Sequence, residues 1–76
     1  MSVAVIGLGF VGLTLALSLA DKGIKIFGVE KDKKSCSIIS KGIPTFNEKG
    51  IKQILERNIG KNFQVFQSLE EIKPKI

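Results

Sequence analysis

Val3-Ala-Val-Ile-Gly7-Leu-Gly9-Phe-Val-Gly12 is the stretch that decides the fold of this chain. The apolar run before Gly7 is typical of a buried strand, and the glycines after it follow the pattern Gly-x-Gly-x-x-Gly. In such a pattern Gly7 permits a tight turn, Gly9 leaves room for a pyrophosphate to approach the backbone, and Gly12 lets a helix pack close to the strand. The stretch therefore predicts a strand, a phosphate-binding turn and a helix in succession.

A second apolar run, Ile24-Lys-Ile-Phe-Gly-Val29, ends at Glu30. Glu30 follows Gly12, the last glycine of the motif, at close to the roughly 20-residue spacing expected for a carboxylate that binds the adenosine ribose of a dinucleotide. A lone Gly-x-Gly-x-x-Gly is weak, because glycines cluster in many loops. Here strand, turn, helix, strand and acidic residue follow in the expected order, which favours a dinucleotide site over an ordinary glycine-rich packing unit.

The backbone N–H groups of Phe10 and Val11 should face the pyrophosphate at the helix start, and we expect their side chains to pack. Glu30 should bind the ribose hydroxyls and repel a 2′-phosphate, which favours NAD over NADP. Lys31 and Lys34 complicate this preference, because a nearby cation can accommodate that phosphate. We interpret both as solvated lysines at a helix start, with Lys34 able to line the adenine–ribose rim. The predicted cofactor-binding residues are Gly7, Gly9, Phe10, Val11, Gly12, Glu30, Lys31 and Lys34.

Hydrophobic periodicity predicts the remaining elements. Strands are expected over residues 2–6, 24–30 and 63–66, and helices over residues 10–22, 33–41 and 48–59. This order, β-α-β-α-α-β, is an α/β Rossmann-type mononucleotide-binding half with a parallel sheet, an incomplete doubly wound domain over residues 1–76. In the expected strand order 3-2-1, the first strand lies at an open edge.

Capping signals set the helix boundaries. Asp32 and Asn47 are the expected N-caps of the second and third helices. Ser68 and Glu71 match a capping box for a further helix start. Pro74 argues against a helix that continues beyond Lys73.

The chain is small and apolar, with 76 residues of which 43% are hydrophobic. Its first predicted helix is apolar nearly all round and needs cover on more than one side. We therefore expect a fragment of a larger protein, or a chain that associates with itself. The net charge of +5 comes from scattered lysines without stacking aromatics, which excludes a focused nucleic-acid surface.

Export or membrane insertion is the alternative interpretation of the uncharged N-terminal stretch. A basic segment before the apolar run is missing, the glycines interrupt that run, and Asp21-Lys22-Gly23 is typical of a helix end. The single cysteine, Cys36, fits a reducing compartment, so we expect a cytoplasmic protein without membrane contact. We interpret Cys36 as a small buried hydrophobe. Histidine is absent, so the chain has no imidazole base or imidazole metal ligand.

Three segments together resemble the N-terminal NAD-binding domain of the UDP-glucose/GDP-mannose dehydrogenase family. They are residues 3–16, Gly28-Val-Glu-Lys-Asp32, and the run from Lys41 to Ile51 that contains Glu48-x-Gly50. Family members commonly carry Asp where this chain has Glu30. The resemblance covers essentially the whole chain.

The resemblance implies an oxidoreductase that converts the C6 alcohol of a nucleotide sugar to a carboxylate with two NAD⁺. The sugar would be UDP-glucose or a UDP-N-acetylhexosamine, as used in polysaccharide biosynthesis. The family's catalytic cysteine and substrate domain come later in its pattern, so this stretch is expected to bind the cofactor alone and to carry no catalytic residue or metal. A free-standing nucleotide-binding or interaction module without chemistry of its own and a β-hydroxyacid dehydrogenase-type cofactor domain are the alternatives.

Overall fold

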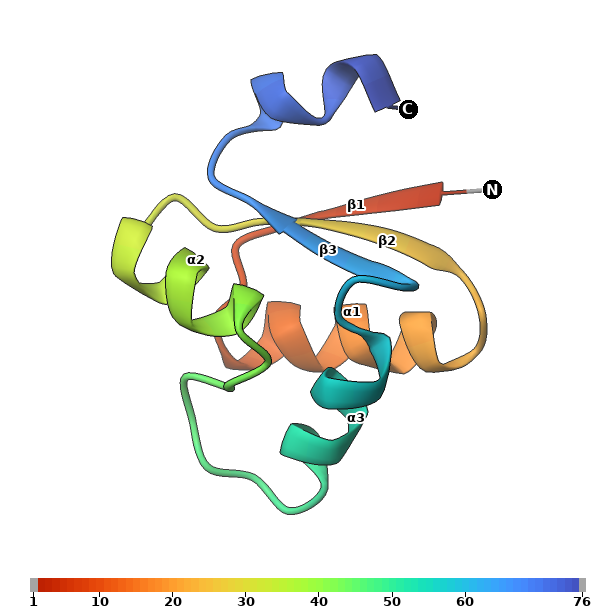
Figure 1. Ribbon diagram of the computed structural model, residues 1–76, viewed down its shortest axis with the longest axis vertical. Helices are drawn as coiled ribbons and strands as arrows, with labels where there is room; N and C mark the ends of the chain where they lie inside the picture. The colour runs from red at the N-terminus through yellow and green to blue at the C-terminus, as the bar shows by residue number, and fades with distance from the viewer. Residues whose placement is uncertain (1, 76) are drawn as a thin grey trace.

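The computed structural model describes residues 2–75, which form a three-stranded sheet with helices on one face and short turns on the other (Figure 1). The elements in chain order are β1 (Ser2–Ile6), α1 (Phe10–Asp21), β2 (Lys25–Val29), α2 (Lys33–Ser40), α3 (Ile51–Asn58), β3 (Phe63–Phe66) and the 3₁₀ turns η1 (Leu69–Glu71) and η2 (Lys73–Lys75). The predicted order of strands and helices is confirmed.

The sheet is parallel with strand order β1-β2-β3. Val3 lies opposite Ile26, and Ile26 lies opposite Phe63, so these apolar residues share one face of the sheet. Each connection between strands passes through a helix, as parallel pairing requires. The sheet confirms the expected order, with β1 at the edge.

The main core fills the space between the sheet and helices α1, α2 and α3. Its fully covered side chains include Leu13, Leu17, Ile39, Leu55 and Phe63. Close packing here depends on Gly28 of β2. A Cβ at that position would lie 2.9 Å from Leu8 Cδ1 and 2.9 Å from Phe63 Cε1, so the missing side chain is the space that these two side chains fill.

A smaller core covers the opposite face of the sheet. Phe27 and Val29 point there from β2 and pack with Ile72, whose side chain is fully buried between η1 and η2. Figure 1 shows the two C-terminal turns on this side, away from α1 and α3. The carboxylate of Glu71 accepts hydrogen bonds from the backbone N–H groups of Gln67 and Ser68, which confirms the predicted capping interaction at Ser68.

Two predicted boundaries are wrong. The third helix begins at Ile51 rather than at residue 48, and its N-cap is Gly50 rather than Asn47. Gly50 has a φ of +83°, a left-handed conformation that breaks the helix one residue before Ile51. Pro74 was expected to prevent a helix beyond Lys73, but the 3₁₀ turn η2 spans Lys73–Lys75 and includes Pro74.

Helix α1 is 12 residues long, and within residues 2–75 no helix is long and apolar enough to cross a membrane. Its buried residues are Leu13, Ala16, Leu17 and Ala20. Phe10, Val11 and Leu15 are 55%, 75% and 51% exposed. The apolar character of this helix therefore exceeds what the 76-residue chain covers.

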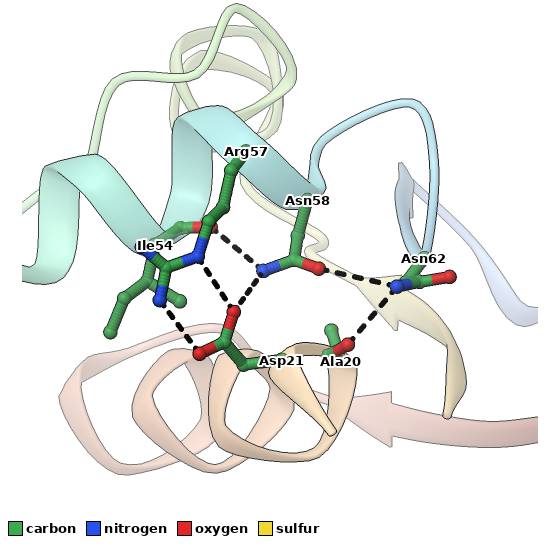
Figure 2. Close-up of polar contacts among 6 residues, drawn as sticks. All are labelled: Ala20, Asp21, Ile54, Arg57, Asn58 and Asn62. Atoms are coloured by element: carbon green, nitrogen blue, oxygen red, sulfur yellow. Dashed lines mark hydrogen bonds and ion pairs between the residues drawn. The ribbon is translucent and has the colours of Figure 1, made fainter. Parts of the chain in front are cut away.

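A group of polar side chains, which we call the α1–α3 clamp, joins the end of α1 to the end of α3 (Figure 2). Arg57 donates from Nε and Nη2 to the two carboxylate oxygens of Asp21, at 2.8 and 2.7 Å. Asn58, 3% exposed, donates to Asp21 Oδ1 and to the carbonyl of Ile54. Asn62 donates to the carbonyl of Ala20 at 3.2 Å. The clamp thus fixes α3 and the start of β3 against α1.

The clamp makes acid stability depend on Asp21. Hydrogen bonds from Arg57 and then Asn58 lower the pKa of Asp21 from 3.8 to about 2. A carboxylate whose pKa is lower in the folded chain stabilises the fold fully above its unfolded pKa, and that contribution is lost as the pH falls through its folded pKa. We expect Arg57→Gln to lower the urea midpoint at neutral pH and to flatten its fall between about pH 4 and about pH 2.

Lys52→Gln is the matched control, because it removes a cation from the same helix. Among residues 2–75 the ion pair of Lys52 is the one with Glu56, which is 4.0 Å long and exposed. This variant should leave the urea midpoint at neutral pH and its fall at acid pH nearly unchanged. Equal pH dependence in Arg57→Gln and the parent chain would contradict the role assigned to the Asp21–Arg57 pair.

Candidate functional site

The glycine-rich loop connects β1 to α1 and leaves donors free at the helix start. Gly7 has a φ of +87°, and its N–H donates to the carbonyl of Val29 at 2.8 Å, which anchors the turn to β2. Gly9 is the N-cap of α1 and has no side chain with which to cap it. The first intrahelical bond runs from the N–H of Leu13 to the carbonyl of Gly9. The N–H groups of the preceding helical residues therefore have no intrahelical acceptor and are available to an anion.

The three glycines of the motif differ in what a side chain would meet. A Cβ at Gly12 would lie 1.8 Å from the carbonyl oxygen of Gly7, which is a backbone atom. A Cβ at Gly9 would meet no protein atom within 4 Å. Gly12 is therefore required by the packing of α1 on the loop, whereas Gly9 leaves space that the protein itself does not use.

Glu30 lies at the end of β2 and reaches the glycine-rich loop. Its Oε1 accepts a hydrogen bond from the N–H of Leu8 at 3.0 Å, and its Oε2 accepts one from the N–H of Asp32 at 3.0 Å. The side chain is half-buried. The carboxylate thus lies beside the loop, and Glu30 directly follows the second strand, as predicted.

A cavity of about 430 Å³ opens at the carboxyl ends of the three strands. Ligands of open α/β sheets bind outside this edge of the sheet. The cavity brings together the glycine-rich loop, the end of β2 and the segment after β3. Its lining consists of Ile6, Gly7, Val29, Glu30, Lys31, Gln67, Ser68 and Leu69.

Some predicted site residues do not line this cavity. Phe10 and Val11 begin α1 beside it, and Gly9 and Gly12 belong to the loop and the first helical turn. Lys34 lies in α2 and is exposed. The expected packing of the Val11 side chain is wrong, since it is 75% exposed, while the ring of Phe10 contacts that of Phe46 edge-on at 5.0 Å between centroids.

The sequence reasoning missed the cavity wall formed by Gln67, Ser68 and Leu69. A signal was present, because these residues directly follow the third strand, and the segments after parallel strands form this edge. Leu69 is 44% exposed and adds an apolar surface beside Glu30.

The N-terminus of α2 is held by Asp32, as predicted. Its carboxylate accepts hydrogen bonds from the N–H and the hydroxyl of Ser35, and these bonds lower the pKa of Asp32. Cys36 lies in this helix and is only half-buried, so its interpretation as a buried hydrophobe is wrong. Within residues 2–75 no three His, Cys, Asp or Glu side chains gather in a way that could hold a metal ion.

The arrangement can bind an extended anionic ligand along the strand ends. Free N–H groups at the start of α1 suit a phosphate, the Glu30 carboxylate suits hydroxyl donors, and Ile6, Val29 and Leu69 offer apolar surface to a ring.

Residues 1–74 match the sequence model of the UDP-glucose/GDP-mannose dehydrogenase family, NAD binding domain. A putative UDP-glucose 6-dehydrogenase of Bacillus subtilis is 36% identical over 93% of this chain and 17% of its own length. A UDP-N-acetyl-D-mannosamine dehydrogenase of Methanococcus maripaludis is 36% identical over 91% of this chain and 16% of its own length.

The fold also matches that of a solved relative. The structure of the UDP-D-ManNAc dehydrogenase from Pyrococcus horikoshii aligns with a TM-score of 0.90 and 27% identity over 96% of this chain and 18% of that chain. The chain therefore spans less than a fifth of each of these three proteins. On the match of residues 1–74, the chain belongs to the UDP-glucose/GDP-mannose dehydrogenase family and corresponds to its NAD-binding domain.

Proposed function

We propose that the chain is the NAD-binding lobe of a nucleotide-sugar 6-dehydrogenase, an enzyme that oxidises the C6 alcohol of a UDP-sugar to a carboxylate with two NAD⁺. The observation that carries the proposal is the Glu30 carboxylate at the strand-end cavity, hydrogen-bonded to the glycine-rich loop. Relatives named for UDP-glucose and UDP-N-acetylmannosamine support a UDP-sugar substrate, either UDP-glucose or a UDP-N-acetylhexosamine.

In this proposal each part of the cavity holds one part of NAD. The N–H groups of Phe10 and Val11 bind the pyrophosphate, and Gly7 and Gly9 leave room for it. Glu30 accepts hydrogen bonds from the hydroxyls of the adenosine ribose. Lys31 lines the same cavity, while Lys34 lies on the exposed start of α2 and attracts the anionic ligand at longer range.

The 76 residues supply binding without the oxidation itself. The chain has no histidine, and its single cysteine, Cys36, lies on α2, outside the lining of the strand-end cavity. We therefore propose that the chain alone binds NAD and leaves UDP-sugars unoxidised. Nucleotide sugar becomes a ligand only when a substrate domain is present.

We predict that the chain binds NAD or ADP-ribose more tightly than NADP, because Glu30 repels a 2′-phosphate. Glu30→Ala should weaken NAD binding by about 1–3 kcal/mol through the loss of hydrogen bonds to a charged acceptor. Calorimetric titration measures both quantities. Equal or tighter binding of NADP by the parent chain would contradict the role of Glu30.

We predict that alanine at Gly12 and alanine at Gly9 have different effects. Gly12→Ala forces α1 away from the loop and should cost about 1–3 kcal/mol of unfolding free energy, or more, because the obstacle is backbone. Gly9→Ala meets no protein atom and should cost less than about 1 kcal/mol, yet weaken NAD binding because its methyl group occupies the pyrophosphate space. Urea unfolding and calorimetry compare the two, and full NAD affinity in Gly9→Ala would contradict the assigned ligand position.

We predict that the isolated chain self-associates, because β1 is an open edge strand and Phe10, Val11 and Leu15 are exposed on α1. Leu15→Glu should shift sedimentation at micromolar concentration toward the monomer. Gln53→Glu, which adds the same charge on the exposed side of α3, is the control and should have no effect. A well-folded monomer in the parent chain would contradict the prediction.

A further inference from the structure

The Glu30 carboxylate connects two segments that are far apart in the sequence. Leu8 lies between the first two glycines of the motif, and its N–H donates to Oε1 across 22 positions of sequence. Asp32 is the N-cap of α2, and its N–H donates to Oε2. One side chain therefore ties the loop before α1 to the residue that begins α2.

These bonds add to the Gly7–Val29 hydrogen bond that anchors the start of the same loop. Leu8 is flanked by Gly7 and Gly9, and glycine has the greatest backbone freedom. The Leu8 side chain is 1% exposed and contacts the space left open at Gly28, so it is anchored in the core. The bond from its N–H to Glu30 adds a second anchor on the backbone itself. With both in place the loop has a defined orientation before a ligand arrives.

The same carboxylate still has acceptors for a ligand. An ionised carboxylate offers about four lone-pair positions on its two oxygens, and the two backbone N–H groups occupy one on each oxygen. One position remains on each oxygen, and Glu30 also lines the strand-end cavity. Two neighbouring hydroxyl donors fit this pair of acceptors.

We propose that Glu30 is a positioning residue that orders the glycine-rich loop in the ligand-free chain, in addition to contacting the ribose. Through Leu8 it couples recognition of the diol to the geometry of the pyrophosphate loop. The part of this inference that concerns the ribose rests on the proposed function, whereas the ordering of the loop does not.

Amide hydrogen exchange of the ligand-free 76-residue chain, followed by NMR, tests the inference. Glu30→Gln keeps the side-chain length but offers one acceptor oxygen and one amide donor, so only one of the two N–H groups retains a partner. We expect exchange at Leu8 or Asp32 to accelerate roughly tenfold or more relative to the core amides of Leu17 and Ile26. Glu56→Gln, on the exposed side of α3, is the charge-matched control and should leave this ratio unchanged.

Glu30→Asp separates the two bonds. Aspartate readily accepts from the backbone N–H two residues ahead, but its side chain is one methylene shorter and does not reach Leu8. Exchange should accelerate at Leu8 while Asp32 stays protected, and the amide proton of Leu8 should move upfield. This selective pattern is one that a general loss of stability does not produce.

Unchanged exchange at Leu8 in both variants would overturn the inference. Uniform acceleration of Leu8 with Leu17 and Ile26 in both variants would also overturn it, because Glu30 would then act on global stability alone. Titration of the parent chain with NAD separates this outcome from the proposed function. Selective acceleration at Leu8 without any response to NAD would support loop positioning and contradict NAD binding, and the reverse pair of results would do the opposite.

Discussion

The close approach of α1 to the glycine-rich loop is the constraint on which the rest of the structure depends. The Cα of Gly12 lies so near the carbonyl of Gly7 that a Cβ would come within 1.8 Å of the oxygen. This contact sets the start of α1, and the position of that start decides where its free N–H groups lie relative to the strand ends. The binding edge of the sheet therefore follows from a packing requirement inside the loop.

The two ends of α1 are fixed by different means and serve different purposes. At its C-terminal end the bidentate pair between Arg57 and Asp21 holds α3 against it, in an exposed position far from the cavity. At its N-terminal end no side chain caps the helix, and the Glu30 carboxylate accepts a hydrogen bond from the preceding loop. The ion pair thus lies at the C-terminal end of α1, and the uncapped N-terminus at the other end is open to an anion.

The sequence was sufficient for features that depend on neighbouring residues. Strand and helix periodicity, the Asp32 cap and the capping box at Ser68 all act within a few positions, and the structure confirms them. The start of α3 was missed because Gly50 adopts a left-handed conformation that composition alone does not reveal. The Asp21–Arg57 pair and the Glu30–Leu8 bond join residues 36 and 22 positions apart, so only the packed fold brings them together. The cavity wall at Gln67–Leu69 was missed although its place directly after the third strand was a signal for this edge of the sheet.

The open edge of β1 explains why the chain presents only one side of a dinucleotide site. In a doubly wound sheet the ligand crevice lies where strand order reverses, so the first strand needs a neighbour on each side. Here β1 pairs only with β2, and the cavity is built from the ends of β1 and β2 and the segment after β3. These are the segments that receive the adenosine half in a Rossmann fold. By analogy with a complete doubly wound sheet, the nicotinamide half would lie beyond the unpaired edge of β1, where backbone groups of that strand have no partner strand. Completion of the site thus requires a neighbour along this edge of β1.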